Sequence, residues 1–310
     1  MNERTTFIEM VTYGFRTLFW RPMHSLIFIA VYSVAMIAYY RWSASEAGVS
    51  FFADYADAIM GLSNGYGADN FFQFFGAILL VSLLIGTVFY AGVYRVLVRE
   101  DAKPWLPIQL GLDELRLFMG LIALFVISML VIFLISLVVV IASFVLTLGI
   151  AAVLGGNDPQ AQGVIGTFVA FGLGVVGIIG AVLPTLYILG RLAVSLPLMI
   201  KLRRFTLGGW SASKGMGWSL LFAHLVVYLL AIGVQIIFAR DVLMASWSMQ
   251  ADPGQFSEQF SQMMANPMGD LVYIGAPVYM LLYLLMLGPT AAIAAKAGAT
   301  SSASDTPQDA

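Results

Sequence analysis

Residues 117–154 read LFMGLIALFVISMLVIFLISLVVVIASFVLTLGIAAVL, an apolar run without a single charged residue. A helix needs about 20 apolar residues to cross the roughly 30 Å hydrocarbon core of a bilayer. The run lacks the alternation of apolar and polar residues found in barrel strands, so it predicts a membrane helix. Five other stretches qualify, which predicts six spans. The six are about 24–40, 71–98, 117–154, 164–200, 218–239 and 271–295.

The composition agrees with this reading. The 310 residues are 60% hydrophobic and 10% charged, whereas soluble domains carry about 25% charged residues. We therefore expect an all-α, polytopic integral membrane protein, with residues 1–299 as one membrane domain and 300–310 as a disordered polar tail. The chain has no cysteine, which excludes disulfides, thiolate nucleophiles and cysteine metal sites.

Basic residues alternate with acidic segments between the spans. Thirteen of the fifteen Lys and Arg residues fall on one predicted side, whereas the other side has Arg41, Arg240 and nine acids. By the positive-inside rule, this bias predicts a multi-pass protein of the bacterial inner membrane with both termini in the cytoplasm. We interpret the first span as a retained signal anchor, because some twenty polar and amphipathic residues precede it. The thirteen Lys and Arg residues on the predicted cytoplasmic side are Arg4, Arg16, Arg21, Arg95, Arg99, Lys103, Arg116, Arg191, Lys201, Arg203, Arg204, Lys214 and Lys296.

Two glycine series indicate an internal repeat. One series precedes the odd spans at intervals of 97 residues, and the other ends the even spans at intervals of 98 residues. Together they predict three hairpins in parallel orientation, with repeat units of about 5–100, 103–200 and 201–296 and equivalent close-packing glycines at the inner ends. Chance spacing among thirty glycines is the alternative. The first series is Gly14, Gly111 and Gly208, and the second is Gly92, Gly190 and Gly288.

A cytoplasmic amphipathic elbow helix is predicted before each odd span. In 5–21, apolar residues recur at steps of three and four, a pattern typical of a helix in the membrane interface; residues 105–116 and 203–218 are the expected counterparts. Such helices either form a docking surface or simply turn the chain between hairpins.

The third and fourth stretches are nearly twice a bilayer crossing in length, so we expect an interfacial extension or a bend in each, with Pro184 as the break in the fourth.

Residues suited to catalysis are scarce. The central parts of the spans contain no Asp, Glu, Lys or Arg, and the deepest charged candidates are Arg95 and Arg191. This absence weighs against a proton-coupled transporter and an intramembrane hydrolase. His24 and His224 suit interfacial capping better than a zinc site, which needs at least three protein ligands. We expect Asp113-Glu114 to form a solvated helix face, and we expect no enzyme activity, metal or cofactor.

A basic cluster before the fifth span is the best candidate for ligand binding. Basic pockets on the cytoplasmic side of a membrane protein can hold an anionic lipid headgroup. The alternative is a cluster that serves only to orient the chain. The candidates are Arg191, Lys201, Arg203, Arg204 and Lys214.

The same region carries a sequence motif. Residues 190–197 read GRLAVSLP, and residues 208–218 read GGWSASKGMGW. The motif resembles the membrane domain attached to some glycerophosphoryl diester phosphodiesterases and found in related six-span bacterial proteins. Trp210 precedes Ser211 rather than following it, and Lys201 stands where an acid is common. The matching residues are Arg191, Ser195, Pro197, Ser211, Lys214, Gly215 and Trp218.

This resemblance implies an all-helical membrane domain without phosphodiesterase activity, since that catalytic barrel would need about 250 further residues. The leading hypothesis is a non-enzymatic membrane scaffold or regulatory protein, with membrane lipids and a membrane protein as partners and no nucleic acid. A small-molecule or lipid transporter is the alternative, and would require a polar cavity at mid-membrane depth around Gln235. A lipid-headgroup enzyme would require acids that converge at one membrane face.

Overall fold

The computed structural model describes residues 4–63, 68–99, 111–155, 167, 181–238 and 271–297. These residues form helices, with no strand among them, and the protein is all-α and polytopic. Six helices in these ranges are long and apolar enough to cross a membrane. The predicted tail, residues 239–270 and residues 100–110 lie outside the described residues. The six helices that are long and apolar enough to cross a membrane are Pro22–Ser43, Phe71–Val98, Leu112–Ile150, Ala181–Leu202, Gly217–Val234 and Val272–Ala297.

A short helix, α1 (Phe7–Trp20), precedes the first span. It begins with a capping box, in which the Thr6 hydroxyl accepts a hydrogen bond from the Glu9 backbone and the Glu9 carboxylate accepts one from the Thr6 backbone. It ends before Arg21, whose φ of −133° and ψ of 57° are not helical, and Pro22 then begins α2 (Pro22–Ser43). A residue before proline avoids the helical region, which explains the elbow at this point.

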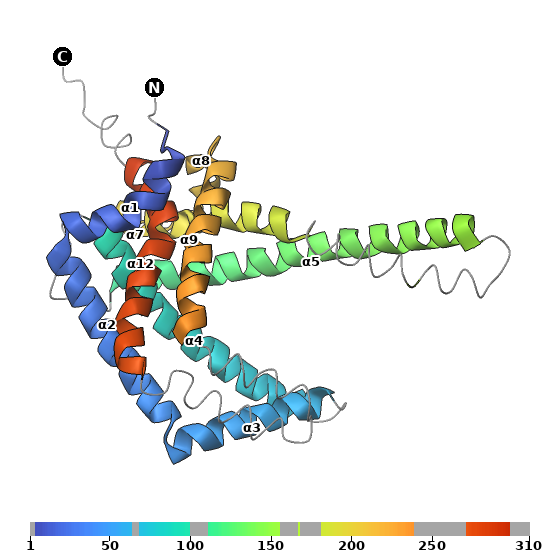
Figure 1. The fold of residues 1–310 in the computed structure, drawn as a ribbon, viewed down its shortest axis with the longest axis horizontal. Coiled ribbons are helices and arrows are strands. Elements are labelled where there is room, and N and C mark those ends of the chain that lie inside the picture. The colour runs from blue at the N-terminus through green and yellow to red at the C-terminus, as the bar shows by residue number, and fades with distance from the viewer. Residues whose placement is uncertain are drawn as a thin grey trace.

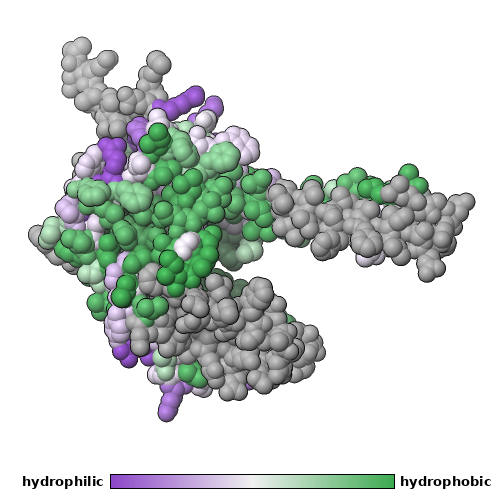
Figure 2. Space-filling model, in the orientation of Figure 1, coloured by the Kyte–Doolittle hydropathy of each residue, from purple (hydrophilic) through white to green (hydrophobic). Residues whose placement is uncertain are grey.

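The bundle is centred on α12 (Val272–Ala297), which contacts α1, α2, α9 (Gly217–Phe238), α4 (Ala68–Val98) and α7 (Ser195–Leu202). Among the six spans it is the most buried inside the protein. Helix α3 (Glu46–Ser63) follows α2 at the opposite end of the bundle from α1 (Figure 1). Hydrophobic residues cover the middle of the bundle, and hydrophilic residues gather toward its two ends (Figure 2). We call the end at which α1 lies the α1 end.

Helix α5 (Leu112–Gly155) projects away from the bundle (Figure 1). Its 44 residues form one uninterrupted helix, about 66 Å long at 1.5 Å per residue. The bend considered for this stretch is therefore absent. In the fourth span the helix is interrupted at Val194, before α7, rather than at Pro184. Pro197 explains this break, because proline lacks the backbone donor that would reach the carbonyl four residues earlier.

The first and third predicted elbows differ in structure, and residues 105–110 of the second lie outside the described residues. Helix α1 has 14 residues, whereas the elbow before the fifth span is α8 (Gly209–Ala212), with four residues. Gly14 lies inside α1, but Gly111 and Gly208 lie just before α5 and α8. The local positions in this glycine series are thus not equivalent, and the threefold repeat stays a prediction.

The second glycine series is also uneven. A Cβ atom at Gly190 would meet no atom within 4 Å, so the prediction that Gly190 is a close-packing point is wrong. A Cβ atom at Gly288 would lie 2.9 Å from the Gly14 backbone nitrogen. Gly92 is buried near the end of α4. Close approach of backbones is therefore a property of Gly288, not of the whole series.

Candidate functional site

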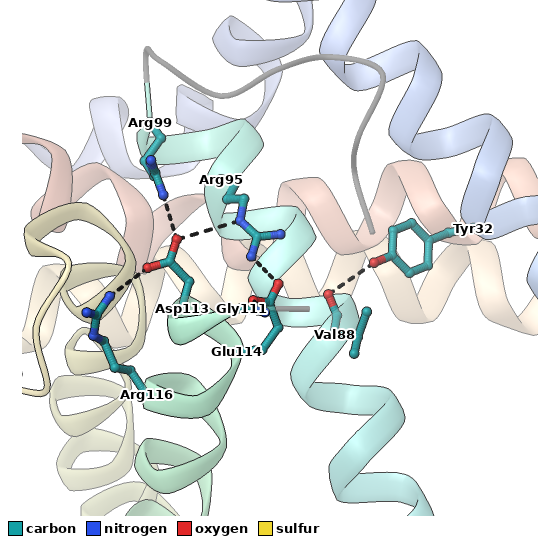
Figure 3. Close-up of polar contacts among 8 residues, drawn as sticks. All are labelled: Tyr32, Val88, Arg95, Arg99, Gly111, Asp113, Glu114 and Arg116. Atoms are coloured by element: carbon teal, nitrogen blue, oxygen red, sulfur yellow. Dashed lines mark hydrogen bonds and ion pairs between the residues drawn. The ribbon is translucent and has the colours of Figure 1, made fainter. Parts of the chain in front are cut away.

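A buried ion pair joins α4 to α5 at the α1 end of the bundle (Figure 3). The Arg95 guanidinium donates a hydrogen bond to the Glu114 carboxylate, and the two side chains are 6% and 7% exposed. The other Glu114 oxygen accepts a hydrogen bond from the Gly111 backbone at 2.9 Å. Glu114 thereby caps the first turn of α5, where the helix dipole also favours negative charge.

Asp113 extends this pair into a network. Its Oδ2 atom lies 2.5 Å from the Arg99 guanidinium and 3.9 Å from Arg95 Nε, and its Oδ1 atom lies 3.0 Å from Arg116 Nη1 (Figure 3). The expectation that Asp113 and Glu114 form a solvated face is therefore wrong. The chain folds the basic end of α4 onto the acidic first turn of α5, and each carboxylate finds arginine there. We call Arg95, Arg99, Asp113, Glu114 and Arg116 the arginine–carboxylate network.

Side chains from α1 and from the turn after it also satisfy carbonyl groups at the end of α4 and just beyond it. Arg21 donates to the carbonyl oxygens of Val96, at 3.1 Å, and Arg99. The Tyr13 hydroxyl donates to the Leu97 carbonyl at 2.9 Å. Helix C-termini carry unpaired carbonyls and partial negative charge, so these donors stabilise the end of α4.

The end of α12 is held in a similar way. Lys201 donates to the Ala295 carbonyl, and Lys296 Nζ lies 2.8 Å from the Glu9 carboxylate on α1. The hydrogen bond from Lys296 lowers the pKa of Glu9 below its ordinary value. The basic residues of the α1 end therefore include several that fasten helix ends together.

Arg191 forms a second polar centre, in the sequence motif. Its guanidinium donates to Ser213 Oγ at 3.1 Å, to the Trp210 carbonyl at 2.7 Å and to the Tyr187 hydroxyl at 3.5 Å. The guanidinium carbon lies 3.7 Å from the centroid of the Trp210 ring. Arg191 is 8% exposed, whereas Trp210 is 44% exposed. The buried guanidinium therefore stacks on a ring that reaches the surface, and it donates its hydrogen bonds to Tyr187, Trp210 and Ser213.

Two glycines allow this close packing. The Gly209 backbone donates to Ser195 Oγ at 2.9 Å, and a Cβ atom at Gly209 would lie 2.5 Å from the Ser195 backbone nitrogen. A Cβ atom at Gly217 would lie 2.5 Å from the Tyr187 ring. Any larger residue at either position would force the elbow away from the fourth span.

The remaining motif residues lie around this centre. Pro197 is buried in α7. Ser211 Oγ donates to the Gly208 carbonyl at 2.8 Å. Gly215 has a positive φ of 77°, which suits glycine. Trp218 is 60% exposed, and its ring centroid lies 5.1 Å from that of Tyr187. The motif thus describes a tightly packed elbow.

The five predicted lipid-headgroup residues differ in their exposure and partners. Arg191 is buried and Lys201 donates to the end of α12, whereas Arg203, Arg204 and Lys214 are exposed. The sequence reading missed Arg4. A Cβ atom at Gly215 would lie 3.5 Å from the Arg4 guanidinium carbon, which places Arg4 beside the Lys214–Gly215 turn. The separation of these residues in sequence hid this proximity. Lipid binding at the exposed residues stays a prediction.

The histidines and the residues around Gln235 provide no further evidence for a ligand or metal site in the described residues. His224 Nδ1 lies 2.9 Å from the Leu220 carbonyl of its own helix. Within the described ranges no group of three His, Cys, Asp or Glu residues could hold a metal ion. The Gln235 side chain lies outside what the structure describes.

No protein-family model, curated protein or solved structure matches the chain.

Proposed function

We propose that this protein is a non-enzymatic scaffold or regulatory protein of the bacterial inner membrane, which binds a membrane-protein partner, anionic lipid or both. Both termini lie in the cytoplasm in this proposal. The positive-inside rule supports this orientation, because Arg16, Arg21, Lys214 and Lys296 lie at one end of the bundle while Glu46, Asp54 and Asp57 lie on α3.

The exposed apolar length of α5 is the observation that supports a protein partner most directly. A straight helix of about 66 Å would fit the roughly 30 Å hydrocarbon core only at a tilt near 60°, whereas membrane helices tilt by about 0–40°. Phe133, Val138 and Phe144 are 63%, 66% and 64% exposed. Among the described elements, α5 contacts α4 and α7. At an ordinary tilt, part of the apolar surface of α5 would extend beyond the hydrocarbon core, where lipid tails cannot cover it. A second membrane protein that packs along α5 would cover that part.

The test is purification from native membranes in a mild detergent, followed by identification of the proteins and lipids present. We expect one protein in a fixed ratio to this chain. The substitution Val138→Asn should lower that ratio, because an amide on the packing face leaves polar atoms unpaired at the interface. Phe222→Asn is the matched control, since Phe222 is 51% exposed on α9. A preparation with no protein in fixed ratio would argue against a scaffold.

Anionic lipid is the second partner in this proposal. Arg203, Arg204 and Lys214 are exposed at the α1 end, and Arg4 lies beside Lys214. Each basic residue near an anionic surface contributes about 1 kcal/mol of attraction. Trp210 and Trp218 are exposed nearby, at 44% and 60%, and tryptophan favours the headgroup level.

The resemblance to the phosphodiesterase-associated membrane domain is part of the same proposal. The packing of Arg191, Ser195 and Gly209 gives that motif a physical role, as the device that fixes an elbow. The alternative function is a small-molecule or lipid transporter. The observation in its favour is that Tyr32, Tyr228 and Tyr283 lie midway along α2, α9 and α12.

A further inference from the structure

An open, apolar hollow lies between the first turns of α5 and the chain that follows α7. Its volume is about 280 Å³, and it is lined by Leu115, Arg116 and Met119 of α5 and by Phe205. The three apolar side chains are each at least half exposed. Concave apolar surface with a few polar groups at its border is typical of places where ligands bind.

The packing of α5 against α7 holds the walls of this hollow together. Gly120, the residue after Met119, lies so close to α7 that a Cβ atom there would lie 2.7 Å from Met199 Sδ. Helix α7 ends at Arg203, whose φ of 52° falls in the left-handed region that residues other than glycine rarely adopt. The chain changes direction there, and Phe205 lines the hollow together with α5. The walls are therefore set by helix packing and by one specific turn.

An excess of positive charge borders the apolar surface. Arg116 lines the hollow, and it shares the Asp113 carboxylate with Arg99, so both oxygens of Asp113 are paired with arginine (Figure 3). The arginine–carboxylate network contains three arginines and two carboxylates, which leaves a formal charge of +1. The two residues before Phe205 are also exposed arginines. A ligand in this hollow would thus meet apolar side chains and positive charge together.

We propose that the hollow binds one anionic phospholipid, with an acyl chain against Leu115, Met119 and Phe205 and the phosphate group beside Arg116. The apolar lining suits an acyl chain rather than a free phosphate ion, and the excess positive charge favours an anionic headgroup over a zwitterionic one. Guanidinium groups bind phosphate oxygens through paired N–H donors. This inference rests on the proposed function, because it gives the anionic lipid named there a defined site.

Native mass spectrometry of the full-length, detergent-purified protein measures this binding. The probes are dioleoylphosphatidylglycerol, which is anionic, and dioleoylphosphatidylcholine, which is zwitterionic and has the same chains. We expect one molecule of the anionic lipid to bind more tightly than the zwitterionic lipid. The headgroup without chains, glycerophosphoglycerol, should not displace it at an equal concentration. Displacement by the headgroup alone would overturn the role given to the hollow.

Two substitutions test the two parts of the site. Arg116→Gln should weaken binding of the first anionic lipid about fivefold, because one basic residue contributes about that factor near anionic lipid. Met119→Trp should also weaken it, because the larger ring fills part of the hollow. Met129→Trp is the matched control and should bind like the wild type, since Met129 is 52% exposed on the same helix and does not line the hollow. Unchanged binding by either Arg116→Gln or Met119→Trp overturns the inference.

Lys214→Gln separates this site from the other exposed basic residues, and it should weaken the first lipid less than Arg116→Gln does. The opposite order would overturn the inference, since the anionic lipid would then bind near Lys214, and the proposed function would stand without this site. If the wild type showed no preference for the anionic lipid, the inference would fail together with the lipid part of the proposed function.

Discussion

Gly14 of α1 and Gly288 of α12 meet backbone to backbone. A Cβ atom at Gly288 would lie 2.9 Å from the Gly14 nitrogen, and a Cβ atom at Gly14 would lie 2.9 Å from the Leu284 carbonyl oxygen and the Leu285 Cα atom. Close approach of backbones stabilises helix pairs in membranes through van der Waals packing, because the hydrophobic effect contributes little to helix association in lipid. This contact seats α1 on the central helix of the bundle.

Replacing either glycine should destabilise the protein. Gly288→Leu forces α1 and α12 apart, and overpacking of this kind costs about 1–3 kcal/mol. The measurement is the melting temperature of the purified protein in detergent. Gly190→Leu is the control, because a Cβ atom there meets no atom within 4 Å. Equal melting temperatures for the two variants would show that the Gly14–Gly288 contact is unimportant.

Breaking the Arg95–Glu114 pair should cost more than breaking a pair at the edge of the network. Arg95→Met leaves Glu114 buried without its arginine, and loss of one partner of a buried pair costs about 3–5 kcal/mol. Removing both charges, in Arg95→Met with Glu114→Leu, should cost less than the single change. Arg116→Ala, whose side chain is 26% exposed, should cost under about 1 kcal/mol. Unfolding by denaturant measures the wild type and these variants together with the single variant Glu114→Leu. Additive effects of Arg95→Met and Glu114→Leu would contradict the pairing.

The contact between Glu9 and Lys296 predicts a dependence of stability on pH. The pKa of Glu9 is lowered below its ordinary value of 4.5. Its contribution is therefore complete above pH 4.5 and is lost as the pH falls through the lowered pKa. Both side chains are about one-third exposed, so the effect should stay below about 1 kcal/mol. The wild type should melt above Glu9→Gln at pH 7, and the difference should vanish near pH 2. A constant difference at both pH values would contradict this assignment.

The elbow at α8 should depend on a planar guanidinium group. Arg191→Lys keeps the charge but loses the stacking on Trp210 and two of the donated hydrogen bonds, so it should destabilise the protein by roughly 2 kcal/mol. Ser211→Ala is the control, because Ser211 bonds only within its own exposed turn. Melting of the Arg191→Lys variant at the wild-type temperature would contradict the role given to Arg191.

The sequence predicted the membrane class because long apolar runs leave few other folds possible, and the described residues contain six helices long and apolar enough to cross a membrane. It also predicted the α1 elbow, where an amphipathic segment ends at Arg21-Pro22. The partners of Arg95 were not predictable, because Glu114 follows 19 residues later and lone charges at span ends usually read as orientation signals. The continuity of α5 was missed for another reason: length alone does not reveal whether a long apolar run bends. The glycine spacing suggested equivalent packing at Gly190 and Gly288, but packing depends on neighbours that one sequence does not reveal.

The most direct test of the proposed scaffold function is site-specific photo-crosslinking in native membranes. A benzophenone amino acid is placed at Phe133 or Phe144 on α5, with Phe222 on α9 as the control position. We expect irradiation to produce a discrete, heavier protein adduct from both α5 positions and none from Phe222. If every position gave lipid adducts alone, α5 would have no protein partner, and the scaffold proposal would be contradicted.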